Sequence, residues 1–134
     1  MRKVTYFAVF EPSAAGAFGV YFPDLPGCIS MGEDFEHAQK IAEEALGLHL
    51  WGMEKDHDEI PKPSQPPFTN MPAGAIVVPV TVFPDIVKNE MDNRSVKTNI
   101  TLPAWLKELA ENKGVNFSQI TQAALKEYLG VEKQ

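Results

Sequence analysis

The sequence has one cysteine and no long hydrophobic run, and both shortages limit what the protein can be. A lone Cys28 cannot form a disulfide within the chain, which favours a reducing compartment. No apolar run approaches the roughly 20 residues that a membrane-spanning helix needs. Residues 1–4 lead directly into an alternating pattern and lack the apolar segment of a signal peptide. We therefore expect a cytoplasmic protein that makes no membrane contact.

Basic residues are also few, and they are unevenly placed. Residues 1–93 carry 6 Lys/Arg and 14 Asp/Glu, a net charge of -8, whereas residues 94–134 carry 6 and 4, a net charge of +2. Because charged surfaces attract partners of opposite sign, this asymmetry predicts two different partners. One partner is expected to be basic and the other polyanionic.

The first part of the chain predicts a small sheet followed by a helix. Apolar residues alternate over 3–10, and after a permissive turn at 13–16 the segments 17–22 and 28–31 read as two further strands. From Asp34, which suits a helix N-cap, the apolar period changes to that of a helix of about five turns. The opposite side of this helix is rich in Glu and Lys, so we expect it to lie across the sheet with one face in water.

Prolines shape the next segment. Five of them, at positions 61, 63, 66, 67 and 72, favour an extended connection over a helix. The β-branched run 75–82 predicts a last strand, and Pro79 within it favours a sheet edge or a bulge. We predict a first domain over 1–83, a hinge over the polar segment 84–93, and a second domain over 94–134.

The sequence of the second domain predicts one strand and two short helices. Residues alternate strictly over 96–102, and Pro103 then suits the first turn of a helix over 104–112. Gly114 ends that helix, and Asn116 can cap a second helix that continues to Leu129. About forty residues of this kind need help to bury their apolar faces, and without cysteines or histidines a second copy is the simplest source. The predicted dimer core comprises Val96, Ile100, Leu102, Trp105, Leu109, Ile120 and Leu125.

The sequence Arg94-Ser95-Val96-Lys97-Thr98-Asn99-Ile100-Thr101-Leu102-Pro103, with the two helices after it, resembles the ribbon-helix-helix repressors. The resemblance implies a two-stranded ribbon in the major groove of operator DNA, where three outward residues would contact bases: Lys97, Asn99 and Thr101. The start of the last helix would contact phosphate through Asn116, Phe117 and Ser118. The ribbon carries only one outward lysine, which is a modest charge for an operator binder. A helical dimerisation tail with a solvated strand face is the alternative.

The segment Phe18-Gly19-Val20-Tyr21-Phe22-Pro23-Asp24-Leu25-Pro26-Gly27-Cys28-Ile29-Ser30-Met31-Gly32-Glu33-Asp34, with the Ala/Glu-rich helix after it, resembles the N-terminal domain of HicB antitoxins. The resemblance implies an α+β fold whose N-terminal βββαβ domain is a partial RNase H-like fold. It also implies a HicA-type toxin as partner, a small ribonuclease that cleaves mRNA with a histidine. The antitoxin would cover the RNA-binding face of the toxin and would not itself be an enzyme.

Four residues are the predicted toxin contacts: Asp24, Glu33, Asp34 and Trp51. Each has a plainer alternative role, because Asp24 suits a turn, Asp34 suits a helix cap, and a tryptophan is more often core. Cys28, in an apolar strand, is expected to be a small core residue and not a reactive thiol.

Two other functions stay open. An active RNase H-like nuclease would need clustered carboxylates for two Mg²⁺ ions, and the candidates are Asp24, Asp34, Glu43 and Glu44. The spacings among His37, His49 and His57 do not give the i, i+4 ligand pair of a helical metal site. We therefore expect no metal and no cofactor. The other alternative is a transcriptional regulator whose first domain senses a different ligand or protein.

Overall fold

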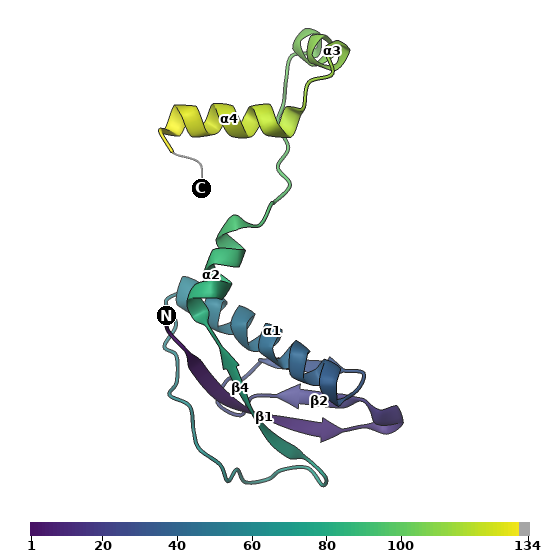
Figure 1. Cartoon of the computed structure of the whole chain (residues 1–134), viewed down its shortest axis with the longest axis vertical. Coiled ribbons are helices and arrows are strands. Elements are labelled where there is room, and N and C mark those ends of the chain that lie inside the picture. Colours follow the sequence, from purple (N-terminus) through teal and green to yellow (C-terminus); the bar gives the residue numbers. More distant parts are fainter. Residues whose placement is uncertain (132–134) are drawn as a thin grey trace. The chain divides into compact units, whose positions relative to one another are not determined.

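The computed structural model describes residues 1–131 and divides the chain into two compact units. The first unit, residues 1–95, contains a four-stranded sheet and two α-helices. The second unit starts at Val96 and contains two α-helices. Figure 1 traces the order of these elements along the chain.

The sheet of the first unit is antiparallel throughout. Its strands are β1 (Val4–Pro12), β2 (Phe18–Tyr21), β3 (Ile29–Gly32) and β4 (Ile76–Val82), arranged in the order β3-β2-β1-β4. All four strands expected from the sequence are present, and β3 lies one residue further along than the predicted 28–31. The outer position of β4 confirms that Pro79 belongs to an edge strand, where a missing backbone donor is tolerated.

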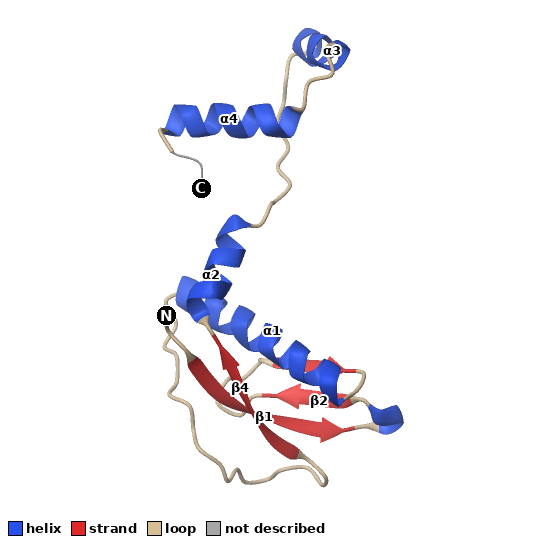
Figure 2. Ribbon diagram, viewed as in Figure 1, coloured by secondary structure: helices blue, strands red, loops and turns tan. Residues whose placement is uncertain are grey.

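Helix α1 (Phe35–Lys55) lies across one face of the sheet (Figure 2). The Asp34 carboxylate accepts a hydrogen bond from the backbone N–H of His37 at 2.8 Å, so the predicted N-cap is confirmed. The helix buries a stripe of small and branched residues against aromatic and branched residues of β1 and β2. This core includes Tyr6, Ala8, Phe10, Val20, Ala38, Ala42, Leu46 and Leu50.

The proline-rich connection from α1 to β4 is extended and packs against the rest of the unit. The Tyr6 hydroxyl donates a hydrogen bond to the carbonyl of Pro61. The rings of Phe68 and Phe7 lie 6.5 Å apart between centroids. Phe7 pairs with Pro79 in the sheet and neighbours the core residues Tyr6 and Ala8, so its side chain points to the face opposite α1. The connection therefore covers part of that second face.

Residues 84–93 are not the hinge expected from their polarity, because they form helix α2 (Pro84–Asn93). Pro84 occupies the first turn, where its missing N–H costs nothing, and Lys88 pairs with Asp92 one turn later at 2.7 Å. Val87 packs against Gly47 of α1. These contacts make α2 part of the first unit.

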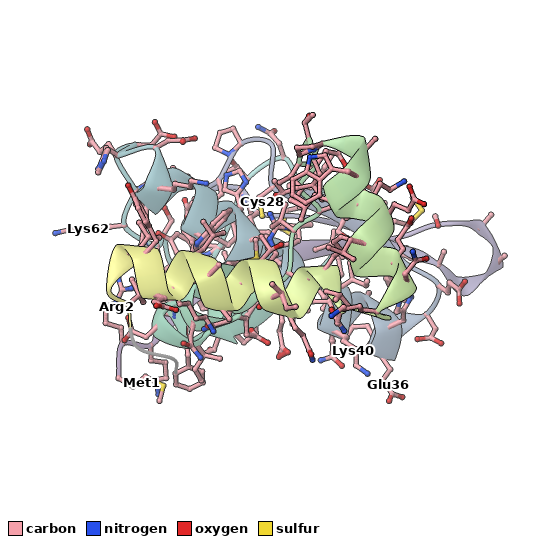
Figure 3. The ribbon with its side chains drawn as sticks, turned by 90° about the horizontal axis from the view of Figure 1, so that it is seen from above. Met1, Arg2, Cys28, Glu36, Lys40 and Lys62 are labelled. Atoms are coloured by element: carbon pink, nitrogen blue, oxygen red, sulfur yellow. The ribbon has the colours of Figure 1, made fainter. Side chains whose placement is uncertain are left out.

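Arg2 ties three parts of the first unit together. Its guanidinium contacts Glu54 of α1 at 2.8 Å and Asp85 of α2 at 3.0 Å. Figure 3 labels Arg2 beside Met1, whereas Glu36 and Lys40 project outward from the other end of α1. Both acidic partners are partly exposed, so this cluster holds the N-terminal residues beside α1 and α2 more than it adds to stability.

The second unit contains α3 (Ala104–Asn112) and α4 (Phe117–Leu129), with the bounds that the sequence predicts. Gly114 takes a positive φ of 65° in the turn between them, and the Asn116 side chain caps α4 by accepting from the backbone N–H of Gln119 at 3.0 Å. The predicted strand over 96–102 is absent from the described part of this single chain. A strand is defined by its hydrogen-bonded neighbour, and the predicted neighbour is a second copy.

Candidate partner-binding surfaces

Asp24 has an intramolecular role that the sequence did not reveal. One carboxylate oxygen accepts a hydrogen bond from the backbone N–H of Ser64 and the other accepts one from the Ser64 hydroxyl, both at 2.7 Å. The pair joins the loop between β2 and β3 to the proline-rich connection, 40 residues later in the chain. Asp24 therefore holds the connection in place, and its two oxygens are already engaged.

Glu33 and Asp34 stand at the junction of β3 and α1. The backbone N–H of Glu33 donates to His37 Nδ1 at 3.0 Å, and the Asp34 carboxylate caps the helix. These contacts fix the backbone of the junction. The Glu33 residue itself is exposed, so its carboxylate is available to a partner.

Trp51 is half-buried near the end of α1. The Lys55 ammonium lies 4.9 Å from the centroid of its ring, one helical turn away. A cation over the ring face is a favourable contact, and it occupies part of the surface of the Trp51 ring. Of the four predicted toxin contacts, Glu33 is the one whose side chain remains most open.

The carboxylates and histidines considered for a nuclease or metal site are spread over the first unit. Asp24 and Asp34 are engaged as above, Glu43 lies beside β4, and Glu44 is exposed on α1. Within residues 1–131, no three His, Cys, Asp or Glu side chains are grouped in a way that could hold a metal ion. In the same range, no helix is long and apolar enough to cross a membrane.

Cys28 is buried in the core, as the sequence predicts. Its thiol lies 3.6 Å from the carbonyl oxygen of Ala45, to which it can donate a weak hydrogen bond. Burial away from water disfavours the thiolate and raises the thiol pKa to about 11. Because the thiolate is the reactive form, this side chain is chemically quiet at neutral pH.

The second unit exposes the apolar side chains that the sequence assigns to a dimer core. Trp105 is 66% exposed and Ile120 is 56% exposed. No residue of α3 or α4 is buried in the single chain. The same exposure holds for Val96, Ile100, Leu109 and Leu125, while Leu102 is half-buried.

The predicted DNA contacts lie in the same unit and are all exposed. Lys97, Asn99 and Thr101 belong to the extended segment before α3. Phe117 and Ser118 open α4, where backbone N–H groups of a first helical turn lack partners within the helix. Asn116 uses its side-chain oxygen to cap that turn.

The sequence alone did not single out a group of exposed apolar residues on the sheet. Ile29 is 70% exposed and Met31 is 66% exposed, although both belong to β3. The alternation of residues 28–31 signals a strand, but it does not reveal which face of that strand another segment covers. The uncovered face becomes visible only when the course of the proline-rich connection is known.

The sequence is similar to proteins whose names give little about their roles. One is an uncharacterized 14.9 kDa protein from the rep-hol intergenic region of Haemophilus phage HP1 (strain HP1c1), 38% identical over 89 residues. That alignment covers 65% of each chain, so it spans just under two thirds of the relative's length. A UPF0150 protein of Synechocystis (strain ATCC 27184 / PCC 6803 / Kazusa) is 32% identical over 57 residues, which cover 42% of this chain and 72% of that protein.

Solved structures of antitoxins share the fold along nearly the whole chain. The crystal structure of antitoxin HicB3 is 26% identical, covers 92% of this chain and 97% of its own, and superposes with a TM-score of 0.51. A chain of a toxin-antitoxin complex from Streptococcus pneumoniae is 23% identical with a TM-score of 0.58, covering 95% of this chain and 99% of that one. At that lower identity the likeness concerns the fold alone.

The family model described as the HicB-like antitoxin of bacterial toxin-antitoxin systems matches residues 6–122. The match begins in β1 and ends within α4, so it includes most of both units. It confirms the resemblance seen in the sequence around Phe18–Asp34 of this chain. This chain therefore belongs to the HicB-like antitoxin family.

Proposed function

We propose that this protein neutralises a HicA-type ribonuclease toxin with its first unit and binds operator DNA as a dimer through its second. The observation that carries the proposal is a family match that extends over both units, from residue 6 to residue 122. Bound toxin would have its RNA-binding and active site covered. The antitoxin dimer would repress its own operon.

The charge of the first unit supports a basic partner. Residues 1–93 carry a net charge of -8, and a toxin that binds RNA must present a basic surface to phosphates. An acidic surface of this size attracts such a partner and competes with RNA for it. The βββαβ order that precedes α2 in the first unit is also consistent with a reduced RNase H-like fold in which carboxylates serve binding and not catalysis.

The exposed apolar faces of α3 and α4 support a ribbon-helix-helix dimer. Two short helices that bury none of their residues gain most by packing against a second copy. Such a dimer would pair the two 96–102 segments as an antiparallel ribbon. Lys97, Asn99 and Thr101 alternate with Val96, Ile100 and Leu102, so the ribbon would point the polar set at the major groove.

The experiment is co-expression of the full chain with a HicA-type toxin, followed by co-purification and an RNA-cleavage assay. We expect a stable complex that does not cleave RNA, and free toxin that does. A gel shift with the DNA upstream of the gene tests the second activity. If the chain binds DNA but forms no complex with the toxin, it is a transcriptional regulator whose first unit senses a different ligand or protein.

A further inference from the structure

One strip of the sheet remains uncovered on the face opposite α1. Ile29 and Met31 of β3 pair with Tyr21 and Gly19 of β2, and the alternate residues Val20 and Gly32 are buried. Neighbours along a strand point to opposite faces, so Ile29, Met31 and Tyr21 share the face away from the helix. We call these three residues the outer strip.

The middle of that face is covered, which sets the outer strip apart from it. Val9 pairs with Tyr21 and Val77 in the same row as Ile29, yet Val9 is fully buried. Further along β1, Phe7 packs against Phe68 of the proline-rich connection. The cover therefore ends between β1 and the outer strip, and large apolar side chains on a folded surface commonly mark a partner site.

Gly19 has no side chain and leaves a gap on the sheet beside Met31, which we call the notch. Glu11 lies on the other side of this gap. Met31, Gly19 and Glu11 form one row across β3, β2 and β1 on this face. A Cβ at Gly19 would have only the Glu11 carbonyl oxygen within 4 Å, at 3.9 Å, so the space above Gly19 is open. The exposed Glu33 follows the end of β3, two residues after Met31. The apolar strip thus has one carboxylate, Glu11, two strands away in the Met31 row and another, Glu33, just beyond the end of its own strand.

We infer that the outer strip is the docking surface for the toxin, an inference that rests on the proposed function. The toxin's apolar contact covers Ile29 and Met31. A long basic side chain of the toxin lies over Gly19, with its methylene stem against Met31 and its charge at Glu11. This arrangement suits Lys or Arg, whose side chains combine an apolar stem with a charged end.

Charge favours a basic protein over a second copy as the occupant. Two first units, each with a net charge of -8 over residues 1–93, repel each other, and a second copy would bring no basic residue from its own strip. Within the described chain, no strand pairs with β3 on its outer side, so a toxin strand can also extend the sheet there. The edge of β4, in contrast, carries Pro79.

The test compares full-length variants against a HicA-type toxin whose catalytic histidine has been replaced, with affinity measured by calorimetry. Met31→Lys places a positive charge on the strip, and we expect binding to weaken about tenfold or more, as for the loss of an interface anchor. Leu48→Lys is the matched control, because it makes the same change at a 50% exposed apolar residue of α1. Its affinity should remain close to that of the unaltered chain.

Gly19→Thr tests the notch separately. Threonine suits a strand, and Gly19 has room for a Cβ, so the variant should melt no lower than the unaltered chain. Its affinity should still fall several-fold, and Glu11→Gln should reduce the dependence of binding on salt.

The possible results distinguish the position of the docking surface from the antitoxin function itself. A toxin that binds the unaltered chain, Met31→Lys and Gly19→Thr equally well would place the docking surface elsewhere and leave the antitoxin function intact. Loss of binding only in Leu48→Lys would move the site to α1. A strip substitution that lowers the oligomeric state but spares toxin binding would identify a second copy as the occupant. Failure of the unaltered chain to bind any toxin would overturn the proposed function and this inference with it.

Discussion

Gly32 at the end of β3 lies directly against Ala38 of α1, and a Cβ at position 32 would come 2.8 Å from the Ala38 Cβ. Real Cβ atoms do not approach so closely, so any larger residue would push the helix off the sheet. The contact joins the strand that carries the outer strip to the helix that covers the core.

We therefore expect Gly32→Ala to lower the free energy of unfolding by about 1–3 kcal/mol, the usual cost of overpacking. Gly52→Ala is the control, because Gly52 lies in the same helix with nothing within 4 Å of its Cβ position. It should raise stability by about 0.5–1 kcal/mol, since alanine is the better helix residue. Urea unfolding should show a lower free energy of unfolding for Gly32→Ala and a higher one for Gly52→Ala. Equal changes in the two variants would contradict the packing of Gly32 against Ala38.

Asp24 should control the order of the proline-rich connection. Asp24→Ala removes both acceptors of Ser64, so we expect limited proteolysis within residues 62–70 to become faster while the core unfolds at nearly the same denaturant concentration. Glu59→Gln alters another exposed carboxylate of the same connection and should leave the cleavage rate unchanged. Equal cleavage of all three proteins would show that the Asp24 contacts do not fasten this segment.

Cys28 should report opening of the core. With its thiol 3% exposed and its pKa raised to about 11, iodoacetamide should modify the native protein slowly at pH 8 and the urea-unfolded protein quickly. Rapid modification of the native protein would contradict the burial.

The same thiol predicts a loss of stability in alkali. Its folded pKa of about 11 lies above the ordinary value of 9.0, so the protonated form is favoured by folding. The contribution is fully present below pH 9 and is lost as the pH rises toward 11. Cys28→Ala should lose less stability over this window, as measured by urea unfolding at successive pH values.

Asp85 predicts the opposite dependence in acid. Hydrogen bonds from the Arg2 backbone and guanidinium lower the Asp85 pKa below its ordinary value of 3.8. The folded state is therefore stabilised above that value, and the contribution disappears as the pH falls through the lowered pKa. The free energies of unfolding of the unaltered protein and of Asp85→Asn, measured by urea unfolding, should differ at pH 6 and become equal in strong acid. A constant difference at every pH would mean that the pair acts through packing and not through charge.

Much of the first unit follows from local signals in the sequence. Alternation locates β1, the change of period locates α1, and Asp34 marks its first turn, because these features depend on nearby residues. The role of Asp24 depends on Ser64, 40 residues away, and no local pattern predicts such a contact. The segment 84–93 resembles a hinge in sequence because most of its residues are polar and exposed, and the helix packs only through Pro84, Val87 and Met91.

The candidate site was predictable in its chemistry and less so in its position. The acidic balance of residues 1–93 is a property of composition, and it indicates a basic partner without a structure. The outer strip is a property of the tertiary fold, since Ile29 is exposed whereas Val9, in the same row of the sheet, is buried. In the second unit, α3 and α4 were predictable from caps and apolar stripes, whereas the proposed 96–102 ribbon would need a second chain to form.

Leu125 tests the proposed dimer. Leu125→Asp places a charge among the apolar residues of α4, so we expect the full chain to change from dimer to monomer in light scattering and to lose DNA binding. Lys126→Asp, one position along the same helix, makes a larger change of charge outside the apolar stripe and should leave the dimer intact. A dimer that survives Leu125→Asp would refute the proposed helix packing.

Lys97 tests the reading of DNA without disturbing assembly. Lys97→Ala removes one polar contact per chain from the proposed ribbon, and a lost base contact costs about 1–3 kcal/mol. Gel shifts should therefore weaken while light scattering still shows a dimer and the RNA-cleavage assay still shows neutralised toxin. Lys107→Ala is the control, because Lys107 lies on α3 with its ammonium 3.8 Å from Glu111, outside the segment that would form the ribbon. If Lys97→Ala lost both DNA binding and toxin neutralisation, the two activities would not reside in separate units. A single exposed side chain of the second unit would then affect toxin binding by the first.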